Sequence, residues 1–142
     1  MRILVIDGQG GKLGALLVEQ LRQRLPEAEV IAVGSNSIAT AAMLRAGAQS
    51  GATGENPVVY LSPSTDLIMG PSGIIMANSL LGEITPAMAV AIGSAKAMKI
   101  LIPLNKCCHH FVGVQELSMS ESVRLAVDAA VKFAQEPQHF CP

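Results

Sequence analysis

Residues 3–14 read ILVIDGQGGKLG, and this stretch decides the fold. Four aliphatic residues end in Asp7 and Gly8, a run typical of a strand that is buried on both faces. Four glycines lie within positions 8–14, and leucines at helical spacing begin at Leu13. A strand, a glycine-rich turn and a helix in this order form the context in which a dinucleotide-binding turn occurs.

The glycine spacing follows a known pattern. Gly8, Gly11 and Gly14 fit Gly-x-x-Gly-x-x-Gly, whereas Leu13 stands at the last glycine of the commoner Gly-x-Gly-x-x-Gly fingerprint. The spacing resembles that of the extended and atypical short-chain dehydrogenases. One glycine permits the positive φ of a tight turn, another lets backbone N–H groups approach a pyrophosphate, and a third lets the helix pack on the strand. The alternative is that the glycines serve the turn alone.

We therefore predict a phosphate-binding loop whose cofactor is NADP or NAD. The tip of the second strand has no acid to bond ribose hydroxyls, and Ser35 and Asn36, with charge from Lys12 or Arg45, favour NADP. The alternative is that Ser35 and Ser37 only cap the next helix. The predicted cofactor-binding residues are Gly8, Gln9, Gly10, Gly11, Leu13, Gly14, Ser35, Asn36, Gly70 and Ser72.

The rest of the chain alternates between strand and helix patterns. Strands are expected at 3–6, 29–33, 58–61, 66–69 and 99–104, with a shorter sixth at 111–114 and a loop at 47–57. Helices are expected at 13–25, 38–48 and 74–81, then from Pro86 after a Thr85 cap, and from Ser118 or Ser120. This alternation predicts an α/β fold: a three-layer, Rossmann-like, doubly wound and mostly parallel sheet of five or six strands. We expect one domain over residues 1–135 and a tail at 136–142.

Composition excludes several classes of protein. Half of the 142 residues are hydrophobic and 15% are charged, so disorder is excluded, and a formal charge of -1 lacks the basic footprint of a nucleic-acid or membrane-surface binder. No signal-peptide core is present, and Glu83 and Pro86 interrupt the most apolar long window. Cys107, Cys108 and Cys141 make no disulfide framework. We expect a cytoplasmic protein whose partner is a small-molecule nucleotide, with no nucleic-acid or membrane partner.

Two other functions are considered. The predicted helix at 74–81 is apolar nearly all round, which is typical of a partner surface. The first alternative is therefore a non-catalytic homo-oligomeric module with structural glycines, most simply a homodimer. The second is a small-molecule enzyme that uses Asn78, Glu83 and Asn105, although no nucleophile–base pair accompanies them. Whether a reaction is catalysed is left open.

Two further features carry possible chemistry. Cys107, Cys108, His109 and His110 are adjacent, without the usual ligand spacings of a zinc site, so no metal is predicted and their role is left open. Asp7 follows the first strand directly. It is a candidate for orienting the glycine turn or for facing the ligand, and the simpler expectation is a buried carboxylate that accepts hydrogen bonds from nearby backbone N–H groups.

Five segments are also familiar as a set. They are 5–11 (VIDGQGG), 34–42 (GSNSIATAA), 51–56 (GATGEN), 77–86 (ANSLLGEITP) and 99–105 (KILIPLN). Together they resemble a family of short bacterial proteins, a domain of unknown function (3842), over most of the chain up to about residue 114. The family has a third glycine where Lys12 stands, and the Cys-Cys-His-His run lies outside its pattern. The resemblance implies no activity, but its segments lie at predicted strand tips, which converge on one crevice in a doubly wound sheet.

Overall fold

The computed structural model describes residues 1–104 and 108–136. Its five strands form one sheet in the order β3-β2-β1-β4-β5, and every neighbouring pair is parallel. The strands are β1 (Arg2–Asp7), β2 (Glu29–Gly34), β3 (Ser50–Thr53), β4 (Leu67–Pro71) and β5 (Met98–Ile102). This is the strand order of a doubly wound, Rossmann-type sheet, so the predicted fold class is confirmed.

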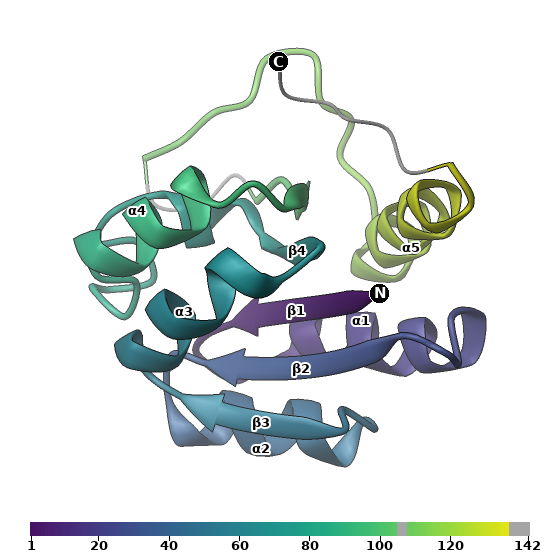
Figure 1. Ribbon diagram of the computed structural model, residues 1–142. Helices are drawn as coiled ribbons and strands as arrows, with labels where there is room; N and C mark the ends of the chain where they lie inside the picture. The colour runs from purple at the N-terminus through teal and green to yellow at the C-terminus, as the bar shows by residue number, and fades with distance from the viewer. Residues whose placement is uncertain (105–107, 137–142) are drawn as a thin grey trace.

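Helices cover both faces of the sheet (Figure 1). One face carries α1 (Lys12–Arg24), α2 (Ser37–Arg45) and α5 (Met119–Gln135), and the other carries α3 (Glu55–Leu61) and α4 (Pro86–Ser94). Ile3 and Val5 point into the core beneath α1, whereas Leu4 and Ile6 point into the core beneath α4. A strand buried on both faces has no polar side to alternate with, which explains the continuous aliphatic run.

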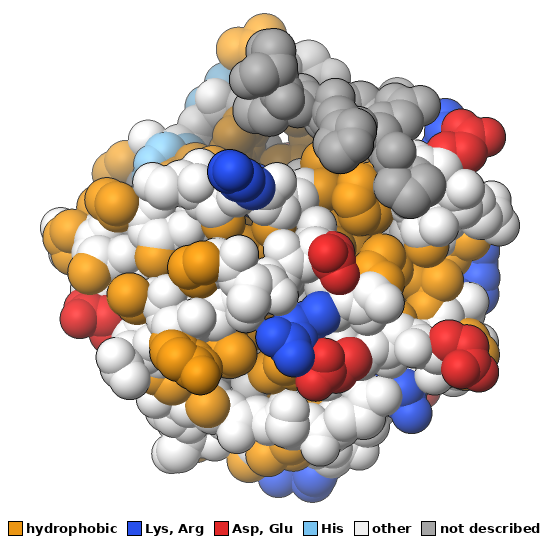
Figure 2. Space-filling model, in the orientation of Figure 1, with side chains coloured by type: hydrophobic (Ala, Val, Ile, Leu, Met, Phe, Trp, Pro, Cys, Tyr) orange, Lys and Arg blue, Asp and Glu red, His pale blue; other side chains and the backbone are white. Residues whose placement is uncertain are grey.

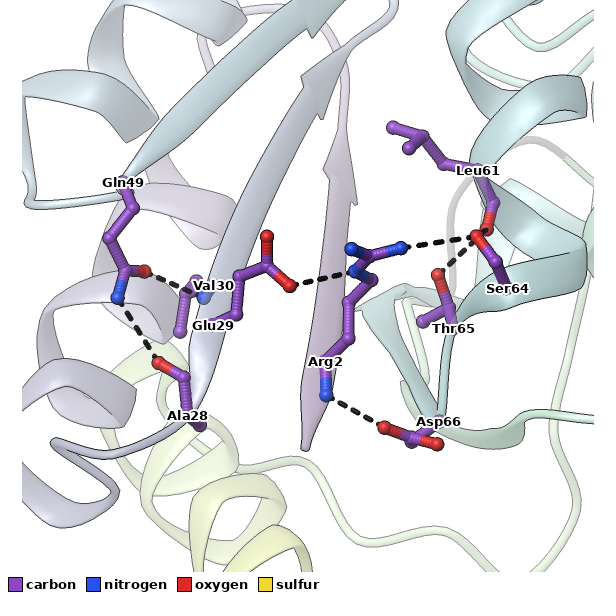
Figure 3. Close-up of polar contacts among 9 residues, drawn as sticks. All are labelled: Arg2, Ala28, Glu29, Val30, Gln49, Leu61, Ser64, Thr65 and Asp66. Atoms are coloured by element: carbon purple, nitrogen blue, oxygen red, sulfur yellow. Dashed lines mark hydrogen bonds and ion pairs between the residues drawn. The ribbon is translucent and has the colours of Figure 1, made fainter.

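A polar cluster ties the strands together at their amino-terminal ends (Figure 3). The guanidinium of Arg2 donates to Glu29 Oε2 at 2.8 Å and to Ser64 Oγ at 3.3 Å. The backbone N–H of Arg2 donates to Asp66 Oδ2 at 2.7 Å. The loops at the carboxyl ends of β1 and β2 lie at the opposite edge of the sheet.

The prediction of a helix at 74–81 is wrong. A short 3₁₀ turn, η2 (Ser72–Ile75), is followed by the β4–α4 loop, which we define as residues 76–85. Asn78, Leu80 and Leu81 adopt φ angles of 64°, 56° and 57°, which no α-helix contains. The chain is folded back here, because the N–H of Asn78 donates to the carbonyl of Ile84 at 2.7 Å. Burial of Ile84 in the core beneath α4 therefore overrides the helical preference of the segment.

Two strand predictions are also wrong. The segment predicted as a strand at 58–61 belongs to α3, and the third strand lies at 50–53, where a loop was expected. Val58 is buried in the core beneath α4 while Val59 and Tyr60 are exposed, a one-sided burial that suits a helix. Residues 111–114 contain a turn at 112–113 and no strand. Of the predicted tail at 136–142, residues 137–142 lie outside the described residues.

The face of the molecule drawn in Figure 2 has no dominant charge. Figure 2 shows blue and red side chains on the same face, dispersed among hydrophobic and polar ones. Among the described residues, no helix is long and apolar enough to cross a membrane.

The caps predicted for α4 and α5 are confirmed: Thr85 Oγ1 accepts from the N–H of Met88 at 3.2 Å, and Ser118 Oγ accepts from that of Glu121 at 3.1 Å.

Candidate functional site

The glycine-rich loop makes a tight turn between β1 and α1. Gln9 adopts a φ of 48° and Gly11 a φ of 71°, and the N–H of Gly11 donates to the carbonyl of Gly8 at 2.9 Å. A Cβ at position 11 would lie 2.6 Å from Ala39 Cα. The left-handed backbone and the approach of α2 therefore both require a glycine at position 11.

The carboxylate of Asp7 accepts two hydrogen bonds from this loop. Its side chain is buried, with Oδ1 accepting from the N–H of Gly8 at 2.8 Å and Oδ2 accepting from that of Gly14 at 2.7 Å. Burial raises the pKa of Asp7, the two N–H groups oppose that rise, and the charge of Glu83 adds to it. The expectation of a buried Asp7 that accepts hydrogen bonds from nearby backbone N–H groups is confirmed. A Cβ at Gly14 would lie 2.6 Å from Met43 Sδ, so close helix packing accounts for this glycine.

The start of α1 leaves backbone donors free. The helix has no side-chain cap and no acidic residue in its first turn. Within the described part of the chain, the N–H groups of Gly10, Lys12 and Leu13 have no hydrogen-bond acceptor. The side chain of Lys12 is exposed beside them. A helix end of this kind attracts an anion, because its N–H groups and its dipole both favour negative charge.

Gly10 differs from the other loop glycines. It is exposed, its φ lies outside the left-handed range, and no atom lies within 4 Å of the position that a Cβ would take. Neither the backbone nor the packing of this fold requires a glycine there. The missing side chain leaves open space in the same turn that carries the free N–H groups.

A carboxylate from a distant segment completes the site. Glu83, in the β4–α4 loop, accepts three hydrogen bonds at Oε1: from the N–H of Gln9 at 3.1 Å, Ser35 Oγ at 2.7 Å and Asn36 Nδ2 at 2.6 Å. Its second oxygen, Oε2, has no hydrogen-bond partner among the described residues. Partial burial would raise the pKa of Glu83, but the three hydrogen bonds outweigh it, so the pKa lies below its usual value. Glu83 is therefore ionised at neutral pH.

Asn36 has two structural roles at the tip of β2. Its Oδ1 accepts from the N–H of Ala39 at 2.9 Å and caps α2, while its Nδ2 also donates to the carbonyl of Gln9 at 2.9 Å. The prediction that Ser35 and Ser37 cap this helix is therefore wrong. The Ser35 hydroxyl bonds Glu83 instead, and Ser37 is the first residue of α2.

The other predicted binding residues serve the sheet and the core. A Cβ at Gly70 would lie 2.3 Å from the carbonyl oxygen of Ile6, so strand packing requires this glycine. Ser72 is buried, and its Oγ accepts from the N–H of Leu104 at 3.1 Å, which ties the end of β4 to the segment after β5. The side chain of Leu13 packs in the core beneath α1. Only backbone groups of Leu13 face the open end of the helix.

The alternative of a small-molecule enzyme rests on Asn78, Glu83 and Asn105, and of the two that the structure describes it brings only one to the glycine-rich loop. Glu83 reaches the glycine loop, whereas Asn78 is exposed and its side chain makes no hydrogen bond to the described residues. Asn105 and Cys107 lie outside the described residues. Over residues 1–104 and 108–136 there is no group of three or more His, Cys, Asp or Glu placed to hold a metal ion. The sequence did not reveal that Glu83 contacts the loop; its only signal was an acid inside an otherwise apolar segment.

A parallel sheet in this order, with a glycine-rich turn after β1, defines a small Rossmann-type α/β domain. Within this class, the chain belongs to the family Domain of unknown function (DUF3842), whose model matches residues 2–135. No curated protein matches the chain. Among solved structures, it is similar to a dodecameric FMN-dependent UbiX-like decarboxylase from Escherichia coli O157:H7. That likeness has 18% identity and a TM-score of 0.46, and it covers 91% of this chain and 75% of the other.

Proposed function

We propose that this protein binds a nucleotide through its phosphate, at the loop from Gly8 to Gly14. The observation that carries the proposal is the open space at Gly10, in a turn where three backbone N–H groups have no acceptor within the described part of the chain. Unsatisfied N–H groups at a helix start are a ready anion site. A phosphate oxygen is small enough to reach them only where no side chain intervenes.

The charges around the loop support a bound anion. Lys12 brings a positive side chain to the first turn of α1. The buried carboxylate of Asp7 already accepts hydrogen bonds from two loop N–H groups, so its negative charge is partly compensated within the turn. The start of a helix adds roughly 0.3–2 kcal/mol of attraction for an anion, and a desolvated phosphate gains from several such donors at once.

NAD or NADP remains the proposed cofactor class. The loop lies at the carboxyl end of β1, beside β4, where the strand order of the sheet reverses and nucleotides bind in doubly wound folds. The earlier reason for favouring NADP is weakened, because the side chains of Ser35 and Asn36 are engaged by Glu83.

The test is a calorimetric titration of the purified protein with adenosine, AMP, ADP and NAD, together with a thermal-shift series. We expect AMP and ADP to bind and adenosine, which lacks a phosphate, to bind at least about tenfold more weakly. Gly10→Asp should abolish AMP binding while the protein stays folded, because a side chain at position 10 enters open space. A folded Gly10→Asp protein that keeps its affinity for AMP would falsify the proposal.

Gly93→Asp is the matched control. Gly93 is an exposed glycine of α4 with equally open surroundings, so the same charge change is made far from the loop. This variant should bind AMP as the wild type does. Gly11→Asp is a poorer test, because a side chain at position 11 collides with the backbone of Ala39 and would disturb the fold itself.

A homodimer remains the second proposal, through exposed side chains of the same segment at 74–81, which forms a 3₁₀ turn and a loop in place of a helix. The helix predicted at 74–81 is absent from the structure. Two aliphatic side chains of this segment are nevertheless exposed: Leu81, in the β4–α4 loop, is 94% exposed and Ile75 is 40% exposed. Exposed aliphatic side chains of this kind favour a partner surface. Sedimentation of the wild type and of Leu81→Lys tests it: a dimer that Leu81→Lys converts to a monomer supports the module, and a wild-type monomer at high concentration opposes it.

A further inference from the structure

We propose that Glu83 makes this site select a nucleotide whose ribose carries a free 2′-hydroxyl and reject one that carries a 2′-phosphate. The inference rests on the proposed function, since it names the ligand class of the same site. It reverses the preference for NADP that the residues after β2 suggested on their own.

The position of the carboxylate leads to this inference. Doubly wound dinucleotide-binding domains place an acid at the tip of the second strand, where it bonds the ribose hydroxyls. Here that tip reads Gly34-Ser35-Asn36 and has no acid. Both side chains instead donate to Glu83 Oε1, which also lies 3.3 Å from the position of a Cβ on Gly8. The β4–α4 loop therefore places the carboxylate of Glu83 next to the tip of β2 and next to Gly8, the first glycine of the turn.

The two oxygens of Glu83 are used differently. Three donors meet Oε1, while Oε2 has no partner among the described residues. A ribose hydroxyl is a donor that an unpaired carboxylate oxygen accepts readily. A 2′-phosphate is mostly dianionic at neutral pH, so it seldom offers a proton and it places negative charge beside negative charge. The free oxygen thus favours one ribose and disfavours the other.

Within residues 1–104 and 108–136, no lysine or arginine forms an ion pair with Glu83 that would offset this repulsion at the tip of β2. Arg45 was the candidate partner for a 2′-phosphate, but it is the last residue of α2, a helix of 9 residues that begins at this tip. A helix of that length separates its ends by roughly 13 Å. Lys12 is the first residue of α1 and belongs to the loop at which the phosphate is proposed to bind.

Two pairs of ligands isolate the ribose from the rest of the nucleotide. AMP and adenosine 2′,5′-bisphosphate differ only by the 2′-phosphate, and NAD and NADP repeat the comparison in a dinucleotide. Calorimetric titration of the wild type should give at least about tenfold tighter binding of the unphosphorylated member of each pair. Glu83→Gln keeps an acceptor for the three donors but removes the charge. It should reduce the ratio to about threefold or less, chiefly by strengthening binding of the 2′-phosphate.

Glu19→Gln is the control for the charge change, because Glu19 is an exposed residue of α1. It should leave the ratio unchanged. Equal wild-type affinities within each pair, or tighter binding of the 2′-phosphate, would overturn the inference. A ratio that Glu83→Gln does not alter would overturn it as well. So would equal tightening of all four ligands by that variant, because Glu83 would then occupy the ligand's own position.

The same experiments separate failure of this inference from failure of the proposed function. If AMP binds, Gly10→Asp abolishes binding and the ribose ratio is near one, the phosphate site stands and only the role of Glu83 is wrong. If none of the four ligands binds a wild-type protein that melts cooperatively, both proposals are wrong. The wild-type ratio needs no variant, so the inference is testable even if Glu83→Gln fails to fold.

Discussion

The carboxylate oxygen Oε1 of Glu83 lies 2.7 Å from the hydroxyl oxygen of Ser35, although 48 positions separate the two residues in the chain. This contact joins the tip of β2 to the β4–α4 loop, and the bond from the N–H of Gln9 joins both to the turn after β1. Three segments at the carboxyl ends of the strands therefore meet at one ionised side chain. The predictions below test how strongly the site depends on it.

Asn36→Asp should destabilise the protein although it keeps the helix cap. Aspartate caps a helix as well as asparagine does, but it cannot donate to Gln9 or Glu83, and it brings a second carboxylate to within hydrogen-bond range of Glu83. We expect the free energy of unfolding at pH 7 to fall by about 1–3 kcal/mol, measured by urea denaturation. Ser118→Asp, at the exposed cap of α5, is the control and should change it by less than about 0.5 kcal/mol.

Asp7→Asn should also destabilise the fold. Each oxygen of Asp7 accepts one buried N–H, and an asparagine retains only one acceptor, so one N–H group is left facing an NH₂ group. The expected loss at neutral pH is about 1–3 kcal/mol in a urea titration. Asp66 is exposed and accepts a single bond from the backbone of Arg2, so Asp66→Asn should stay within about 0.5 kcal/mol of the wild type. Similar losses in the two variants would contradict this account of Asp7.

The two carboxylates should give opposite pH dependences. The pKa of Glu83 is lowered in the folded protein, so its ionised form adds stability above the usual glutamate range, roughly 4.3, and that stability is lost as the pH falls through the lowered pKa. In thermal melts below that pH range, the melting temperature of the wild type should therefore no longer exceed that of Glu83→Gln. The pKa of Asp7 is raised, so its contribution declines as the pH rises from the usual aspartate range through the raised value. An advantage over Glu83→Gln that persists unchanged at acid pH would refute the first assignment.

Leu81→Asn should stabilise the protein. Leu81 has a φ of 57° and is 94% exposed, so asparagine relieves an unfavourable left-handed backbone without loss of packing. The expected gain is about 1 kcal/mol in the free energy of unfolding. Leu80 has a similar φ of 56° but packs against the core beneath α4. Leu80→Asn should therefore lower the stability, and a gain in both variants would mean that Leu80 contributes no packing.

Much of the fold could be predicted because its signals are local. The aliphatic run before Asp7 indicates a strand buried on both faces, and Thr85 followed by Pro86 indicates the start of a helix within a few residues. Placement of the glycine turn between β1 and α1 follows from the same kind of pattern. The predicted contribution of Ser35 and Asn36 to the site was correct in position only, because both residues bond to Glu83 and their side chains are not free to receive a phosphate.

Other features depended on contacts between distant parts of the chain. Helix α3 was predicted as a strand, since its short apolar run has the same composition in either form. The apolar segment after β4 was predicted as a helix, but burial of Ile84 and its bond to Asn78 fold it into a loop with left-handed residues. No local pattern reports such a contact.

The amino-acid sequence by itself therefore determined the class of fold and the glycine turn, because strand burial, helix periodicity and capping act over a few neighbouring residues. The tertiary structure alone decided that Gly10 is the loop glycine with open space beside it, and that Glu83 meets the tip of β2. Both depend on which backbone atoms and side chains approach one another across segments far apart in the chain. Such distances are set by the packing of the sheet and its helices as a whole.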